Sequence, residues 1–235
     1  MPVATPATGW SLAGRIATAG DGRVVALDAP ERGLLLDGGR DRVLAVDLRT
    51  PCPAGDHWIR GDDLIAVYEP PDPRRLRATA MWRLHPHHAA STPAACELTL
   101  SAQTALVESD GLLSVTSDLA ADGVRARRRD GGWCTLAPGA QPPDDATCLL
   151  VRRPTAAGPT AAVLVAAHPS DVRRIAVQWH DGRVAIACWL FTTALEKGVL
   201  LRGRVTAAVG PAADAEAWAD RLADAFAAAP PPLTA

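Results

Sequence analysis

Residues 172–191 read VRRIAVQWHDGRVAIACWLF, two alternating apolar segments joined by Asp181-Gly182. A two-residue β-hairpin loop of type I′ needs positive φ at both central positions, which Asp tolerates and Gly adopts without strain. Such a loop pairs Arg174 with Trp189, where the guanidinium can stack on the indole, and His180 with Arg183. One face of the predicted hairpin is apolar and consists of Ile175, Val177, Trp179, Val184, Ile186 and Cys188.

The same dipeptide recurs along the chain, which favours a succession of hairpins. Asp-Gly occurs six times, also at positions 21–22, 37–38, 110–111, 122–123 and 130–131. The segments between these turns are rich in Val, Leu, Ile and Trp. We expect strands at residues 10–18, 23–27, 33–36, 43–48, 64–69, 75–84, 96–107, 112–116, 124–128, 133–136, 147–152, 161–168, 172–180, 183–191 and 198–209.

Two long segments alternate clearly. In residues 75–84, apolar side chains occupy one face and mostly Arg, Thr and Met the other, the period of a half-buried strand. In residues 96–107, Leu98 and Leu100 lie opposite Glu97, Thr99 and Ser101. Residues 137–145 are rich in Pro, Gly and Asp, but the segments on either side have similar composition. They therefore predict a loop inside one domain spanning residues 1–235.

One helix is expected at the end of the chain, at residues 214–228. Pro211 and Asp214 supply a start signal, and a Pro run from residue 230 stops the helix. Trp218, Leu222 and Phe226 recur every four residues and predict a stripe that docks on a sheet. The fold class is therefore all-β: an antiparallel β-sandwich with one C-terminal α-helix.

Composition excludes several classes of function. The formal net charge of -2 gives no electrostatic reason to expect nucleic acid or an anionic membrane as a partner. No segment approaches the roughly 20 apolar residues of a membrane helix, and the N-terminus does not resemble a signal peptide. The 5 cysteines are scattered singly. This pattern favours reduced thiols in a cytoplasmic protein.

Motifs for cofactors and metals are weak. The chain has neither a phosphate-binding glycine loop nor a nucleophile elbow, so we expect no cofactor. The sequence His85-Pro86-His87-His88 could ligate zinc or nickel. It has no helical spacing and no nearby carboxylate or cysteine to complete a tetrahedron, so a loop without metal is the simpler interpretation.

Candidates for polar chemistry lie on several predicted strands. Glu97, His168, His180 and Glu196 have the residue types of acid–base catalysis. Lys197 is the only lysine in a chain that otherwise uses Arg, and it follows Glu196 directly. Because a compact ammonium differs from a planar guanidinium, Lys197 is a candidate for a ligand site. A salt-bridged start of a strand explains the same pair and remains open.

The C-terminal residues also carry a family resemblance. Residues 195–204, LEKGVLLRGR, are followed by residues 218–226 and by Pro230-Pro231-Pro232-Leu233. This order resembles the end of uncharacterised bacterial proteins with a galactose-mutarotase-like β-supersandwich. The resemblance implies two large twisted sheets, one of which offers a concave sugar-binding face. Sugar epimerases of this fold pair a catalytic His with a catalytic Glu, but their motifs match no position here.

Two hypotheses of function follow. In the first, the protein binds or isomerises a sugar or sugar derivative on an exposed sheet face, with Arg174, His180, Trp189, Glu196 and Lys197 as contacts. Aromatic planes stack on sugar C–H faces, and charged groups bind hydroxyls. In the second, the same face serves a non-catalytic protein-interaction or assembly domain. A concave polar pocket favours the first hypothesis, and a flat apolar patch favours the second.

Overall fold

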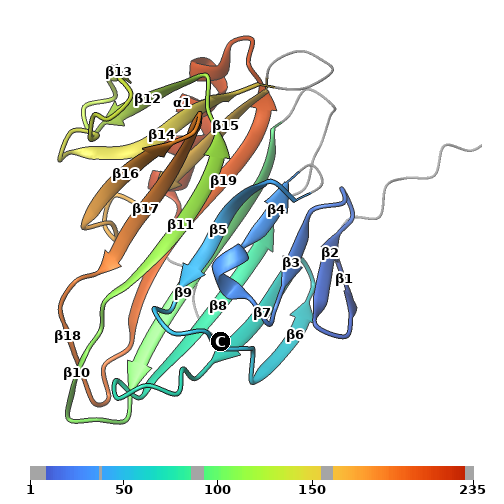
Figure 1. The fold of residues 1–235 in the computed structure, drawn as a ribbon, viewed down its shortest axis with the longest axis vertical. Coiled ribbons are helices and arrows are strands. Elements are labelled where there is room, and N and C mark those ends of the chain that lie inside the picture. Colours follow the sequence, from blue (N-terminus) through green and yellow to red (C-terminus); the bar gives the residue numbers. More distant parts are fainter. Residues whose placement is uncertain (1–8, 37–38, 86–92, 155–160, 231–235) are drawn as a thin grey trace, which may run out of the picture.

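The chain folds into two large antiparallel sheets packed face to face, with one helix on the outside (Figure 1). A computed structural model describes residues 9–36, 39–85, 93–154 and 161–230. Asp37-Gly38 and most of the histidine cluster, Pro86 to His88, lie outside these ranges. Within them, the sheets confirm the all-β sandwich and its single C-terminal α-helix. None of the helices in these ranges is both long and apolar enough to cross a membrane.

In the described residues, sheet A contains eight strands. Its order is β1 (Trp10–Ala13), β2 (Ile16–Ala19), β3 (Val24–Ala26), β4 (Leu34–Leu36), β5 (Asp41–Asp47), β11 (Leu113–Ala120), β17 (Arg183–Phe191) and β16 (Arg174–His180). Sheet B contains nine described strands. Its order is β13 (Trp133–Leu136), β12 (Gly123–Arg128), β14 (Ala146–Arg153), β15 (Ala161–Ala167), β19 (Leu201–Pro211), β9 (Ala94–Thr104), β8 (Leu76–Leu84), β7 (Asp63–Tyr68) and β6 (Asp56–Arg60).

Three smaller elements complete the described fold. Strands β10 (Glu108–Asp110) and β18 (Ala194–Glu196) form a two-stranded ribbon. A single 3₁₀ turn, η1, covers Pro30–Arg32, and the helix α1 covers Ala215–Ala228. The strands of each sheet pair antiparallel throughout. Apolar side chains from the two inner faces form one continuous core, in which Trp82 and Tyr68 are fully buried.

The hairpin from β16 to β17 confirms the predicted register. Asp181 and Gly182 have φ of 46° and 71°, the positive values that a type I′ turn needs. Arg174 pairs with Trp189 and His180 with Arg183. The predicted apolar face is buried in the core, apart from Trp179, which is half-buried.

Other Asp-Gly pairs do not all form hairpins. Positions 21–22 and 130–131 lie in the connections of the β2–β3 and β12–β13 hairpins. Asp110-Gly111 and Asp122-Gly123, in contrast, lead from one sheet to another, because β10, β11 and β12 belong to three different sheets. Local turn chemistry predicts a reversal there, but the partner of each new strand depends on the tertiary structure.

Some strand boundaries also differ from the prediction. Residues 10–18 form two strands, because the chain turns at Gly14, whose φ is 60°. Strand β6 was not predicted, and the expected strand at 96–107 ends at Thr104 before β10 begins. The loop predicted at residues 137–145 is confirmed: its Gln141 side chain bonds the backbone N and O of Val177, covering the outer edge of β16.

Helix α1 packs on the outer face of sheet B, as its apolar stripe predicts. Trp218 and Phe226 are 5% and 8% exposed and contact a cluster that includes Leu150 and Leu164. The Trp218 indole donates a hydrogen bond to the Pro211 carbonyl (2.9 Å). Asp214 lies at the start of the helix, but its side chain makes no capping hydrogen bond. Besides this packing, Arg127 of β12 forms ion pairs with Asp220 and Asp224 of the helix, both at 2.8 Å.

The helix covers the part of this face formed by β13, β12, β14, β15, β19 and the start of β9. Further along, the outward side chains of β7, β8 and β9 are mostly polar. We call this part the uncovered face; it comprises Asp63, Ile65 and Val67 of β7, Glu69 just after β7, and Arg77, Thr79, Met81, Arg83, Glu97, Thr99, Ser101 and Gln103 of β8 and β9.

Candidate functional site

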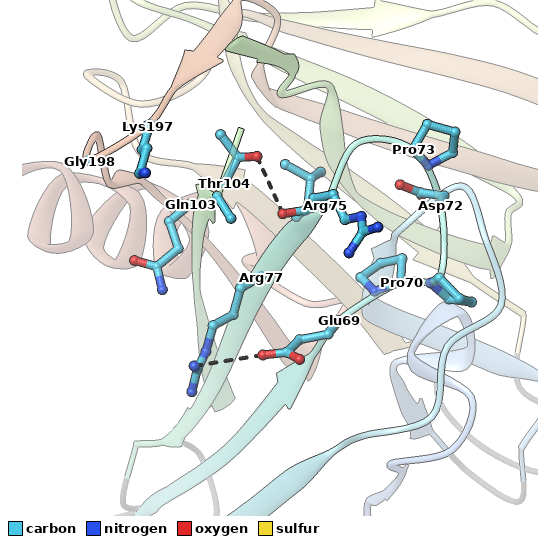
Figure 2. A pocket seen from close by; sticks show the side chains of 13 residues that line it. Glu69, Pro70, Asp72, Pro73, Arg75, Arg77, Gln103, Thr104, Lys197 and Gly198 are labelled. Carbon is cyan, nitrogen blue, oxygen red and sulfur yellow. Dashed lines mark hydrogen bonds and ion pairs between the residues drawn. The ribbon is translucent and has the colours of Figure 1, made fainter. Parts of the chain in front are cut away.

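A cavity of about 1020 Å³ lies at one end of the uncovered face (Figure 2). It forms where the loop after β7 meets the start of β8, the end of β9 and the turn after β18. Its lining consists of Glu69, Pro70, Pro71, Asp72, Pro73, Arg75, Leu76, Arg77, Gln103, Thr104, Ala105, Lys197 and Gly198. Figure 2 shows Lys197, Gln103 and Arg77 on one side, and Pro70, Asp72 and Pro73 on the other.

The proline-rich loop is held by one aspartate. Asp72 accepts hydrogen bonds from the Arg74 backbone N–H (2.9 Å) and from its Nε (3.0 Å). The Arg74 guanidinium also donates to the carbonyls of Leu48 and Leu112. Burial alone would raise the pKa of Asp72, but the hydrogen bonds from Arg74 outweigh it and lower that pKa. The ionised Asp72 carboxylate therefore holds the proline-rich loop in place along one side of the cavity.

Hydrogen bonds also fix the floor of the cavity. The Thr104 hydroxyl donates to the carbonyls of Arg74 (3.0 Å) and Arg75 (3.3 Å), which joins the loop to the end of β9. Arg75 has a φ of 49°, so the chain turns sharply here as it enters β8. Glu69 and Arg77 form an exposed ion pair at 3.7 Å.

Lys197 reaches the cavity from the turn after β18. Its backbone N–H donates to the Val107 carbonyl (3.2 Å), which places the residue beside the end of β9. Among the described residues, neither Lys197 nor Arg75 has a carboxylate within ion-pair distance. The salt-bridged start of a strand, which the sequence left open, is therefore not what the structure shows for Lys197.

The other predicted contacts lie elsewhere. Arg174 and Trp189 are together on the outer face of sheet A, with the guanidinium carbon 5.9 Å from the indole ring centre. The indole N–H of Trp189 is buried without a hydrogen-bond partner. His180, at the end of the same hairpin, has its Nε2 3.8 Å from an Asp118 oxygen. The predicted stacking of Arg174 on Trp189 is thus confirmed, but none of these three residues lines the cavity.

Glu196 lies neither in the cavity nor on the outer face of sheet A. It lies on the exposed ribbon, directly opposite Glu108. The five predicted contacts therefore fall into three groups, and of these five only Lys197 lines the cavity. Alternation in residues 75–84 places Arg77 on the outward face, but the sequence alone did not single out Glu69, Arg77 or Gln103. Their meeting requires the pairing of β7, β8 and β9.

A histidine–glutamate pair lies further along the uncovered face. His85 Nε2 and Glu97 Oε2 are 3.6 Å apart; the side chain of His85 is 46% exposed and that of Glu97 is 11% exposed. Arg83 pairs across the strands with Glu97 and forms an ion pair with Asp63 at 2.7 Å. Among the described residues, there is no group of three or more His, Cys, Asp or Glu side chains that could hold a metal ion.

His168, another predicted acid–base candidate, lies under the end of α1. Its ring packs edge-on against Phe226, and Nδ1 shares a hydrogen bond with Ser170 (2.8 Å). Burial and the nearby Arg204 guanidinium lower the pKa of His168, because both disfavour the charged imidazolium. The residue therefore belongs to the helix contact rather than to an open site.

Comparisons with known proteins concern the fold. No protein-family model and no curated protein matches the chain. Among solved structures, a candidate mutarotase (YeaD) from Salmonella typhimurium is 13% identical, with a TM-score of 0.45; the match covers 90% of this chain and 96% of that one. A candidate aldose 1-epimerase from Klebsiella pneumoniae is 10% identical, with a TM-score of 0.38, and covers 75% of this chain and 60% of that one.

Proposed function

We propose that the protein binds a sugar or sugar derivative in the cavity beside Lys197. The observation that carries this proposal is the mixed hydrogen-bonding capacity of the lining. Lys197 and Arg75 only donate, Glu69 accepts, and the Gln103 amide does both. Each hydroxyl of a sugar also donates and accepts, so a polyhydroxyl ligand can use all of these groups. The volume lies at the upper end of the range for small-molecule sites.

The free charges of the lining support a polar ligand. Because Lys197 and Arg75 have no ion pair with a described residue, a ligand can engage them without breaking an interaction. Prolines 70, 71 and 73 give the opposite wall rigid apolar surface, which can contact sugar C–H groups. Preorganised walls reduce the entropy lost on binding.

Isomerisation needs more than binding. Opening a sugar ring requires one group that takes the proton of the anomeric hydroxyl and another that protonates the ring oxygen. In the cavity, we assign the first role to Glu69 and the second to Lys197. The His85–Glu97 pair lies six residues away along β9, about 20 Å at the rise of a strand. It is therefore too distant to serve a single sugar bound at Gln103.

Thermal-shift screening of sugars and sugar phosphates tests the proposal first. A compound that raises the melting temperature is then titrated against wild type, Lys197→Arg and Arg60→Lys. We expect Lys197→Arg to weaken binding, because a guanidinium is larger and planar. Arg60→Lys, an equally conservative exchange of an exposed residue outside the cavity, serves as control.

The same ligand separates binding from catalysis. Anomer exchange followed by NMR should accelerate with wild type and lose that acceleration with Glu69→Gln, while affinity changes little. Acceleration that survives Glu69→Gln contradicts the catalytic assignment. If the protein responds to none of the sugars, the proposal is wrong and the protein-interaction hypothesis remains. The five free cysteines support the cytoplasmic localisation that we propose with it.

A further inference from the structure

The two-stranded ribbon of β10 and β18 projects at the end of the molecule next to the cavity (Figure 1). Its inner face is anchored, because Leu195 is fully buried and the Ser109 hydroxyl donates a hydrogen bond to the Arg74 carbonyl (2.7 Å). In the described fold, the two strands pair only with each other, so their outer edges carry unpaired backbone groups. An extended segment of another protein can therefore add to the ribbon as a third strand.

Exposed aliphatic side chains gather around this ribbon. Leu106 and Val107 precede β10 and are 37% and 84% exposed; Val199 and Leu200 follow β18 and are 40% and 52% exposed. They are four of the seven large hydrophobic residues exposed in the described part of the chain. The hydrogen bond from Lys197 N–H to the Val107 carbonyl joins the two segments. We call the four residues the tip patch.

Unmatched negative charge lies at the same end of the ribbon as the tip patch. Glu108 directly follows Val107 and is paired across the ribbon with Glu196, so two like charges face each other. Both glutamates are exposed, and neither has an ion pair with a described residue. At the other end of the ribbon, Asp110 already has a partner, Arg49, at 2.6 Å. Only the end beside the tip patch therefore lacks a cation.

We propose that the tip patch and the Glu108–Glu196 pair bind an extended segment of a partner protein that is both basic and aliphatic. A Lys or Arg of that segment, placed between the two glutamates, replaces a repulsion by two attractions. Its aliphatic side chains remove the tip patch from water. Lys197 does not supply this cation, because its side chain lines the cavity and has no described carboxylate within ion-pair distance. An acidic partner would add a third negative charge.

This interface goes beyond the proposed sugar site and does not depend on it, although the two share a segment. Lys197 and Gly198 line the cavity, and Val199 and Leu200, the next residues, belong to the tip patch. Peptide binding is measured without sugar and with Lys197 unchanged, so either proposal can fail alone.

Three short synthetic peptides test the chemistry of the partner. One alternates Lys and Val, the second alternates Glu and Val, and the third alternates Lys and Ser. Fluorescence anisotropy of the labelled peptides measures their affinities. We expect the Lys/Val peptide to bind with a Kd below about 1 mM and to bind more weakly as salt screens the charges. The other two should bind about tenfold more weakly or not at all, because each lacks one of the two features.

Variants of the glutamates test the charge. Glu108→Gln with Glu196→Gln should weaken binding of the Lys/Val peptide about tenfold, because the added cation then has no carboxylate to pair with. Asp144→Asn with Asp145→Asn removes two exposed carboxylates in the loop at residues 137–145 and should leave the affinity unchanged. This control separates the ribbon from the general attraction of an acidic protein for a basic peptide.

Variants of the aliphatic residues test the tip patch. Val107→Ser with Leu200→Ser should weaken binding of the Lys/Val peptide about tenfold, the effect of losing one important contact. Leu12→Ser with Ile16→Ser changes two exposed aliphatic residues on β1 and β2 and should have no effect. Circular dichroism checks each fold, and Val107→Ser alone replaces the double variant if that variant does not fold.

Several results would overturn the interface. The Lys/Val peptide may not be replaceable: equal binding of the Glu/Val or the Lys/Ser peptide contradicts the proposed partner chemistry. Wild type that does not bind the Lys/Val peptide up to about 1 mM also overturns the proposal. So does an affinity that is unchanged by the glutamine pair or by the serine pair, or one that falls equally with the matched controls.

Discussion

The two halves of the outer face of sheet B differ although the same strand, β9, runs through both. At its start, Ala95 joins the apolar cluster beneath α1; at its end, Gln103 lines the cavity. Small and aliphatic outward residues allow a helix to dock, whereas further along the outward residues of β8 and β9 are mostly polar and α1 does not reach them. The covered half therefore contributes stability, and we propose that the uncovered half binds a ligand. The following changes test this division.

The largest effect is expected at Trp218. Its indole is buried against the covered half, so Trp218→Ala should reduce the free energy of unfolding by about 3–5 kcal/mol. Urea unfolding measures the change. Trp58→Ala is a suitable control, because Trp58 is 42% exposed on β6 and should matter much less. Equal losses for the two variants would show that the halves do not differ in this way.

A smaller effect is expected at Gly210, which lies directly under the helix. A Cβ at this position would come 2.9 Å from the Trp218 ring and 3.1 Å from Pro93. Gly210→Ala should therefore cost about 1–3 kcal/mol by overpacking. Gly123→Ala, where an added Cβ meets nothing within 4 Å, should cost less. Differential scanning calorimetry compares the two; a neutral Gly210→Ala would mean that the helix shifts freely.

Acid should loosen the covered half through His168. Its pKa is lowered in the folded state, so the unfolded chain binds the proton more readily. This contribution to stability is complete above the ordinary histidine pKa, about 6.5, and is lost as the pH falls below it. Melting temperatures at several pH values should show a drop in wild type that His168→Gln reduces. His180→Gln, at an exposed site, is the control.

The smallest effect on stability is expected on the uncovered half. Gln103→Ala removes an exposed side chain with no described structural role, so the free energy of unfolding should change by less than about 0.5 kcal/mol. Sugar affinity should nevertheless fall if the cavity is the binding site. A large loss of stability would show that Gln103 belongs to the fold rather than to the site.

Local patterns were sufficient for much of the fold. Asp181-Gly182 sets its own turn and register, because positive φ and a two-residue loop leave little choice. Alternation in residues 75–84 identified a buried face that includes Trp82, and the Trp218–Phe226 stripe identified the docked helix. The pairing of Arg174 with Trp189 followed from the same register.

The candidate site was less accessible from the sequence. Lys197 was selected because it is the only lysine, and it does line the cavity. His180, Trp189 and Arg174 were grouped with it only because their residue types suit sugars, and the structure separates them from it. Arg77 and Gln103 come from the neighbouring strands β8 and β9 and Glu69 from the loop after β7, and no local pattern relates these segments to one another.

The sequence by itself determined most of the long strands, one hairpin register, the helix and its buried stripe, because turn chemistry and hydrophobic period act over a few residues. The tertiary structure alone decided which sheet each strand joins after Asp110-Gly111 and Asp122-Gly123. It also decided that Lys197 meets the proline-rich loop more than 100 residues earlier in the chain. Such long-range pairing depends on burying both sheets' apolar faces together, a free energy that no short segment carries.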